Sequence, residues 1–167
     1  MTSATSTADG HPTGRALPPG YYGATEVAIG DHYRTGRITV TESHITAFCG
    51  LSGDFFDIHV DDTFARSHGF SGRVAHGLLG LSMVDGLKNR AKVSFAAVAS
   101  MGWNWRFRGP IMIGDTIEAV ITVRACTPHP RREGQSRLTL GFSVLNQKGE
   151  CVQEGETELL CLNAKPM

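Results

Sequence analysis

The segment from His76 to Leu87 limits the possible folds of this sequence more than any other. Its apolar residues lie on nearly every side of a helix; they are Leu78, Leu79, Leu81, Met83, Val84 and Leu87. A helix that is apolar all round is normally enclosed by the rest of the protein. Gly77 and Gly80 each cost such a helix roughly 1 kcal/mol relative to alanine, so they favour a close approach of a sheet or a ligand to its backbone. We therefore expect a central, enclosed helix.

After this helix the sequence shows the period-two alternation of β-strands. The alternating runs lie at about Phe95 to Phe107, Thr116 to Arg124, Leu138 to Val144 and Cys151 to Leu162. Successive side chains of a strand point to opposite faces, so each run can turn one face toward a core. One apolar helix followed by four antiparallel strands predicts an α+β protein, in which a curved antiparallel sheet wraps around a central apolar helix.

The N-terminal region differs in composition. Residues 1–20 are mostly Thr, Ser, Ala, Gly and Pro with almost nothing apolar to bury, which predicts a disordered tail. Residues 21–165 are then expected to form a single domain, because a chain of 167 residues suits one domain with a core. The capping-box spacing of Thr39-Val40-Thr41-Glu42 predicts the start of a short helix that ends near Gly50 to Gly53.

Charge and cysteine usage exclude several classes of protein. The chain has 16 basic and 16 acidic residues, so it lacks the cation excess of a general nucleic-acid binder. It has no run of about 18 apolar residues that would span a membrane. No secretion signal is evident, and the four cysteines show neither CxxC nor zinc-ligand spacing. Together these features predict a reducing, cytoplasmic location.

Two motifs carry the residues expected to do chemistry. The run Gly53-Asp54-Phe55-Phe56-Asp57-Ile58-His59 places carboxylates and an imidazole in a turn, and Ala75-His76-Gly77 opens the central helix. The first N–H groups of a helix have no partner within it and can point at an anion. A carboxylate, an imidazole and oriented amides are the parts needed to move protons beside a polarised carbonyl.

These motifs resemble the signature of the MaoC-like, R-specific enoyl-CoA hydratase (3-hydroxyacyl thioester dehydratase) family. The family pattern reads roughly GD-x-N-P-L-H, D-x-x-F-A and G-R-I-A-H-G-M-L, and this chain has GD-F-F-D-I-H, V-D-D-x-F-A-R and G-R-V-A-H-G-L-L between Gly53 and Leu81. The chain departs from the pattern at Phe56-Asp57, which stand where the family has Asn-Pro. It also has Asp85 at a helix position that is often Ser.

The resemblance implies a hotdog fold, an assembly of two or more identical chains, and a hydro-lyase activity. The implied reaction is the reversible hydration of trans-2-enoyl thioesters of coenzyme A or acyl carrier protein to (R)-3-hydroxyacyl thioesters. Asp54 and His59 are the implied catalytic pair, and the Gly77 N–H polarises the thioester carbonyl without a metal or other cofactor. The expected pocket residues are Phe56, Asp57, His76, Leu78 and Asp85. With Lys88, three residues further on, Asp85 suggests short or polar acyl groups.

Two other functions stay open. A thioesterase on the same fold would place a water beside a carboxylate such as Asp85. A non-catalytic thioester-binding or structural partner commonly lacks the Asp-His pair, which this chain has. A metal site is disfavoured, because the acids and histidines from Asp54 to His76 lack the spacing of calcium or zinc ligands.

Overall fold

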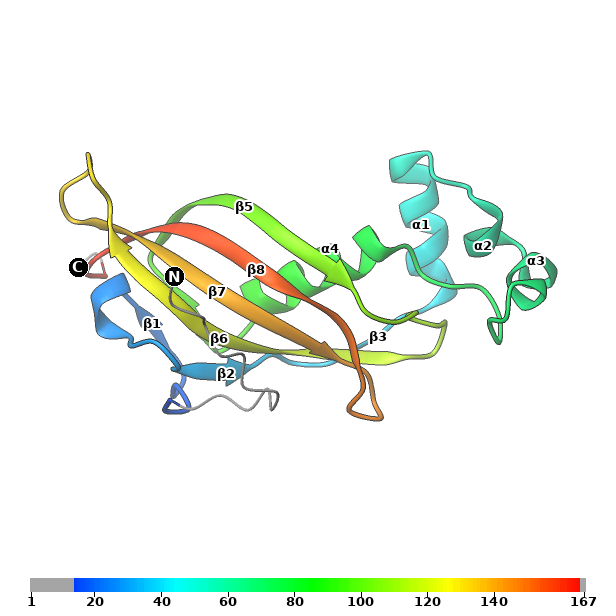
Figure 1. Cartoon of the computed structure of the whole chain (residues 1–167), viewed down its shortest axis with the longest axis horizontal. Helices are drawn as coiled ribbons and strands as arrows, with labels where there is room; N and C mark the ends of the chain where they lie inside the picture. The colour runs from blue at the N-terminus through cyan, green and yellow to red at the C-terminus, as the bar shows by residue number, and fades with distance from the viewer. Residues whose placement is uncertain (1–13, 166–167) are drawn as a thin grey trace, which may run out of the picture.

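The structure is a computed structural model that describes residues 14–165 (Figure 1). Its helices are η1 (Ala24–Glu26), α1 (Glu42–Ser52), α2 (Asp57–Val60), α3 (Asp62–Ser67) and α4 (Gly77–Asn89). Its strands are β1 (Gly20–Tyr22), β2 (His32–Arg34), β3 (Ile38–Thr39), β4 (Val93–Phe95), β5 (Ala97–Phe107), β6 (Thr116–Pro128), β7 (Gln135–Leu145) and β8 (Cys151–Leu162). Within the described residues, no helix is long and apolar enough to cross a membrane.

A curved sheet with the strand order β2-β6-β7-β8-β5 wraps around α4, as predicted (Figure 1). All neighbouring strands in this order are antiparallel, and β3 also pairs with β6. Strands β1 and β4 form a separate parallel pair. Helices α1, α2 and α3 lie together beyond one end of the sheet, next to the N-terminal end of α4 (Figure 1).

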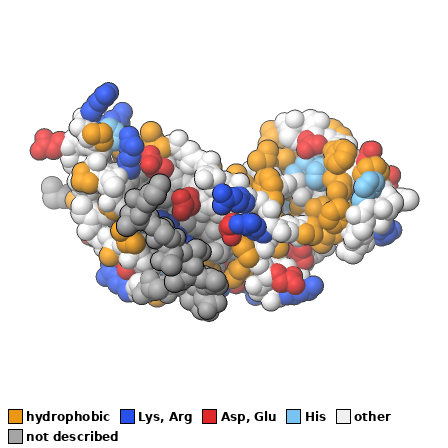
Figure 2. Space-filling model, viewed as in Figure 1, with side chains coloured by type: hydrophobic (Ala, Val, Ile, Leu, Met, Phe, Trp, Pro, Cys, Tyr) orange, Lys and Arg blue, Asp and Glu red, His pale blue; other side chains and the backbone are white. Residues whose placement is uncertain are grey.

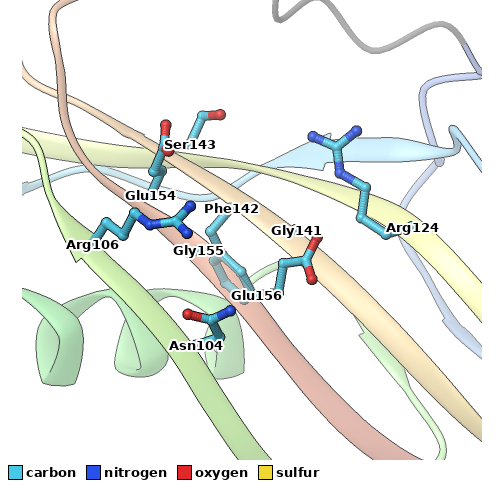
Figure 3. A pocket seen from close by; sticks show the side chains of 9 residues that line it. All are labelled: Asn104, Arg106, Arg124, Gly141, Phe142, Ser143, Glu154, Gly155 and Glu156. Carbon is cyan, nitrogen blue, oxygen red and sulfur yellow. The ribbon is translucent and has the colours of Figure 1, made fainter. Parts of the chain in front are cut away.

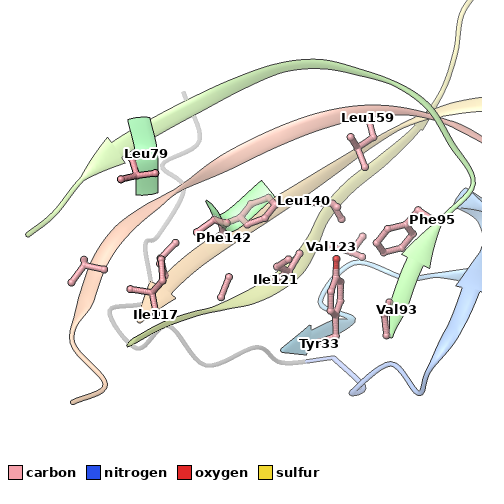
Figure 4. Close-up of a cluster of buried hydrophobic side chains, with 14 of the residues drawn as sticks. Tyr33, Leu79, Val93, Phe95, Ile117, Ile121, Val123, Leu140, Phe142 and Leu159 are labelled. Carbon is pink, nitrogen blue, oxygen red and sulfur yellow. The ribbon is translucent and has the colours of Figure 1, made fainter. Parts of the chain in front are cut away.

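The core lies between the concave face of the sheet and α4 (Figure 4). Period-two alternation places one face of β6 and one face of β7 in it, and both faces are fully buried; their residues are Ile117, Ala119, Ile121, Val123, Leu138, Leu140, Phe142 and Val144. From α4, Leu79 and Val84 pack against this face. Fully burying one such side chain contributes roughly 1.5–3 kcal/mol, so the helix and sheet hold each other in place.

Gly77 and Gly80 allow the close approach that the sequence predicted. A Cβ at Gly77 would lie 2.6 Å from the ring of Phe107, and one at Gly80 would lie 2.4 Å from Nε2 of Gln153. Both neighbours lie on strands of the sheet, β5 and β8. The two glycines therefore set the distance between α4 and the sheet beside the candidate site.

Two predictions at the N-terminal side are wrong in part. Residues 14–20, assigned to a disordered tail, belong to the fold: Leu17 is 6% exposed, and its N–H donates to the His32 carbonyl oxygen. Residues 1–13 of that tail lie outside the described residues. The predicted start of α1 at Thr39 is also wrong. Thr41 caps this helix together with His44, because Thr39 lies in β3, where it pairs with Thr116 of β6.

Candidate active site

The catalytic turn follows α1 and is formed by local backbone geometry. Gly53 ends α1 with a φ of 76°, a left-handed conformation that glycine adopts without strain, and its N–H donates to the Cys49 carbonyl oxygen. The Asp54 carboxylate then accepts the Phe56 N–H at 3.2 Å, which closes an Asx-type turn. His59 lies one turn further, in α2. Asp54 and His59 are thereby turned toward each other.

The orientation of His59 is fixed by the chain that leads into α4. Its Nδ1 lies 2.7 Å from the Val74 carbonyl oxygen, and the Val74 N–H donates to the Ile58 carbonyl oxygen at 3.1 Å. A carbonyl only accepts, so Nδ1 carries the hydrogen and Nε2 of the neutral ring keeps a free lone pair. His59 is therefore held in the tautomer that serves as a base.

His76 joins the two motifs. Its Nε2 donates to the Asp54 carbonyl oxygen at 3.0 Å, and its ring stacks on that of His59 with a centroid distance of 3.7 Å. His76 is buried, and its Nδ1 has no hydrogen-bond partner among residues 14–165. It thus ties the catalytic turn to the first residue of α4, Gly77.

Asp54, His59 and His76 each offer a possible ligand atom within 4.8 Å of the others, which is a spacing that metal sites also show. The two imidazole planes, however, are stacked at an angle of 26°. Ring nitrogens coordinate a metal in the plane of the ring, and two stacked rings cannot both direct a lone pair at one ion. This geometry suits proton transfer better than metal binding.

The predicted site residues gather at one end of α4, with one exception. Phe56 is exposed with its ring centroid 6.3 Å from that of His59, Asp57 starts α2, and His76 stacks on His59. Leu78 is exposed in the first turn of α4. Asp85 lies in the third turn of α4, about 12 Å along the helix axis from Gly77, and accepts a hydrogen bond from Lys88. Figure 2 shows hydrophobic side chains around the histidine-bearing surface of the lobe formed by α1, α2 and α3. The exposed large hydrophobic residues from α1 to α2 are Leu51, Phe55, Phe56 and Val60.

A mostly apolar cavity of about 310 Å³ lies beside Gly77, between Val74 and Phe107. A second hollow of about 310 Å³ lies on the outer face of the sheet, where Arg106 and Glu156 flank the glycines of β7 and β8 (Figure 3). The second hollow is lined by none of the predicted site residues. The cavity beside Gly77 is the one that borders the helix N-terminus.

Three contributors were not predicted from the sequence. The Val74 carbonyl orients His59, Phe107 packs over Gly77, and Gln153 donates to the Gly77 carbonyl oxygen at 3.0 Å. Gln153 also accepts from Trp105 Nε1 at 3.0 Å. Period-two alternation puts Gln153 on the same face of β8 as the buried residues Thr157 and Leu159, whereas a main-chain carbonyl leaves no signal in residue type.

Comparison with known proteins identifies the family. The family model described as "MaoC like domain" matches residues 24–140. This chain belongs to the MaoC-like family. It is 28% identical over 122 residues to an (R)-specific enoyl-CoA hydratase of Rhodospirillum rubrum, an alignment that covers 73% of this chain and 80% of the relative. It is 32% identical over 118 residues to a 3-hydroxybutyryl-CoA dehydratase of Methylorubrum extorquens, covering 70% of each.

Solved structures confirm the predicted fold of this MaoC-like chain. A MaoC-like dehydratase from Rhodospirillum rubrum superposes with a TM-score of 0.75 at 26% identity, over 85% of this chain and 97% of that one. A Mycobacterium tuberculosis protein described as a double hotdog fold superposes with a TM-score of 0.74 over 87% of this chain and 46% of that one. At 17% identity the latter comparison shows the fold alone. The fold is the hotdog fold.

Proposed function

We propose that this chain catalyses the reversible hydration of trans-2-enoyl thioesters to (R)-3-hydroxyacyl thioesters. The observation that carries the proposal is the Asp54–His59 pair, whose polar atoms lie within 4.8 Å of each other at the N-terminus of α4. Two hydrogen bonds of about 2.8 Å span at most about 5.6 Å, so one water can bridge these groups. The names of the hydratase and dehydratase relatives support the same reaction.

The geometry suggests a division of roles. The free Nε2 of His59 accepts a proton from the water as its oxygen adds to C3, and a proton is passed through Asp54 to C2, so that the pair ends the step in the protonation state in which it began. The pair lies on one face of the substrate, so the hydroxyl group and the hydrogen are added to that same face and the addition is syn. The two groups share one water and act as a unit, so the acid and base roles belong to the pair. The proposed reaction uses no metal or other cofactor.

The N-terminus of α4 is suited to polarising the thioester carbonyl. Gly77 is the first residue of the helix, where N–H groups have no partner within the helix. Negative charge that develops on the thioester oxygen is stabilised by such an N–H and by the helix dipole. The thioester then lies between this amide and the Asp54–His59 pair, against the apolar cavity beside Gly77.

The test is a panel of trans-2-enoyl-CoA substrates with crotonyl-CoA as the shortest member. Hydration removes the enoyl absorbance and gives the (R)-3-hydroxyacyl product, which chiral chromatography identifies. Release of free thiol without loss of the enoyl group would overturn the proposal in favour of a thioesterase. The position of Asp85 does not support that alternative, because it is paired with Lys88 and lies about 12 Å from Gly77.

We also propose that the chain forms a homodimer through β5. This strand is 11 residues long and lies at the edge of the sheet, and its exposed residues include Val98, Met101 and Phe107 at 53, 53 and 56%. A long apolar edge strand is normally covered. Sedimentation analysis should give a dimer, which Met101→Lys should weaken; a wild-type monomer at micromolar concentration would refute this.

A further inference from the structure

His76 is buried at the start of α4 without capping that helix through its side chain. It occupies the N-cap position and is 3% exposed, yet its imidazole makes no hydrogen bond to the first turn. The ring instead lies between Phe48 of α1, at a centroid distance of 4.9 Å, and His59 of α2, at 3.7 Å. Serine, threonine, aspartate and asparagine are the usual N-cap residues, so a histidine at this position needs another explanation.

The hydrogen on the His76 ring is placed by its acceptor. Nε2 lies 3.0 Å from the Asp54 carbonyl oxygen, which only accepts, so Nε2 carries the hydrogen. Nδ1 is buried and has no partner among residues 14–165. A second hydrogen on Nδ1 would leave a charged donor buried and unpaired, which is costly. The arrangement therefore favours a neutral His76 beside a His59 that gains a proton.

The stack bears on the step in which the His59 ring becomes charged. In the proposed reaction His59 takes a proton from the water at Nε2, while its Nδ1–H donates to the Val74 carbonyl oxygen. The resulting imidazolium lies face to face with the neutral His76 ring. An aromatic face attracts a cation within about 6 Å, and more strongly where water is excluded. His76 therefore favours the charged form of His59, which forms only as the reaction proceeds.

The Nε2–H of His76 acts on the other member of the pair. It donates to the main-chain oxygen of Asp54, whose carboxylate in turn accepts the Phe56 N–H at 3.2 Å. Asp54 itself is exposed, so burial does not hold it in place. The bond from His76 fixes the backbone from which the Asp54 carboxylate extends toward His59. One buried residue thus contacts both members of the pair through different atoms.

We propose that His76 is a positioning residue with two separable functions in the hydration step. Its ring face stabilises the imidazolium form of His59, and its Nε2–H holds Asp54 in place opposite that imidazole. This inference rests on the proposed hydratase function and adds a third residue to it. Neither function requires a contact between His76 and the substrate.

Three substitutions separate the two functions in the hydration of crotonyl-CoA. His76→Gln keeps an N–H at the place of Nε2 and loses the ring, so kcat should fall about 3- to 30-fold. His76→Phe keeps a ring face and loses the donor, so kcat should fall about fivefold. His76→Ser loses both but supplies a good N-cap, so kcat should fall by the product of the two factors while α4 keeps its start. KM should change by less than about threefold, because His76 does not touch the substrate.

His68→Phe is the matched control. His68 also stacks on an aromatic ring of the same lobe, that of Phe64, at 4.2 Å and at the same angle of 26°, but it is exposed and does not contact the pair. This variant should leave kcat unchanged. Wild-type kcat in folded His76→Gln or His76→Phe overturns the proposal, and so does a loss that appears in KM instead of kcat.

Nuclear magnetic resonance separates this inference from the hydratase function. Nitrogen chemical shifts of the wild type should place the hydrogen on Nε2 of His76 and on Nδ1 of His59. The ring protons of His59 should show a ring-current shift that His76→Gln removes and His76→Phe keeps. If crotonyl-CoA is hydrated but His76→Gln leaves these shifts unchanged, the inference is wrong and the hydratase function stands. If no enoyl thioester is hydrated, the hydratase function is wrong, and the shifts alone decide whether His76 holds the pair as inferred.

Discussion

Gly80 and Gly86 lie on the same helix, α4, but in opposite surroundings, so one substitution at both positions tests the packing described above. A Cβ at Gly80 would lie 2.4 Å from Nε2 of Gln153 and 2.9 Å from Cδ1 of Ile111. A Cβ at Gly86 meets no described atom within 4 Å. We expect Gly80→Ala to destabilise the protein and Gly86→Ala to stabilise it.

The expected loss of stability in Gly80→Ala follows from the hydrogen bonds that Gln153 makes. Gln153 is 1% exposed, donates to the Gly77 carbonyl oxygen and accepts from Trp105 Nε1. Displacing its amide costs about 1–3 kcal/mol for a buried group left unpaired and about 1–3 kcal/mol for overpacking, offset by about 1 kcal/mol of helix propensity. A net loss of about 3 kcal/mol corresponds to a fall in Tm of roughly 6–12 °C for a chain of this size. Gly86→Ala gains only the propensity, a rise of roughly 2–4 °C.

Thermal unfolding followed by circular dichroism, at one protein concentration, measures both changes against the wild type. Urea titration gives the free energies independently. The hydratase assay should show a further loss in Gly80→Ala, since Gln153 also holds the first turn of α4 beside the site. If Gly80→Ala were as stable as Gly86→Ala, the close packing of Gln153 against the helix would be refuted.

Three further predictions concern chemistry and pH. Asp54→Asn and His59→Ala should each lower hydratase turnover by about 10²- to 10⁴-fold with an unchanged fold by circular dichroism; near wild-type turnover would exclude the pair. Although burial acts to raise the pKa of Asp31, hydrogen bonds from Ala28 N–H and Arg15 outweigh it and hold that pKa below its usual value. Asp31→Asn should therefore lower Tm at pH 7, and the difference from wild type should shrink as the pH falls below about 4; a constant difference would contradict this. Burial, with Cys126 nearby, raises the pKa of Cys161 to about 11, so iodoacetamide at pH 8 should leave this thiol unmodified in the native protein by mass spectrometry, and its rapid labelling would contradict the burial.

Periodicity predicted the central helix and the long strands well. An apolar surface on all sides of residues 76–87 required an enclosed helix, and the structure has α4 at Gly77–Asn89 within the sheet. The four alternating runs correspond to β5, β6, β7 and β8. Alternation could not show that β5 lies at the edge, because the position of a strand in a sheet depends on pairing between distant segments.

The short elements before α4 were harder to predict. Residues 14–20 have little apolar content, yet Leu17 is buried because the chain there pairs with β2 through backbone bonds that composition does not reveal. The cap of α1 was placed at Thr39, whereas Thr41 fills that role, since both threonines offer a hydroxyl and only strand pairing decides between them. Such choices depend on tertiary contacts rather than on local preference.

The structure brings the main residues of the predicted site together, and their catalytic roles stay predictions. The motifs named Asp54, His59 and Gly77, and the structure places the pair beside the first residue of α4. The contact between His59 and the Val74 carbonyl was not predictable, because a main-chain acceptor has no residue type.

The bond from His59 to the Val74 carbonyl has a consequence for how such a sequence can change. No side-chain substitution at position 74 removes a main-chain oxygen, so the hydrogen on Nδ1 is protected against most point mutations. Insertions or deletions have a different effect. The loop of residues 68–73 can change in length while Val74 keeps its bridge to Met112 and its place two residues before His76. A single residue added between Val74 and His76 would move the Val74 carbonyl away from the His59 imidazole. Related sequences should therefore vary in length before residue 74 but not between residues 74 and 76.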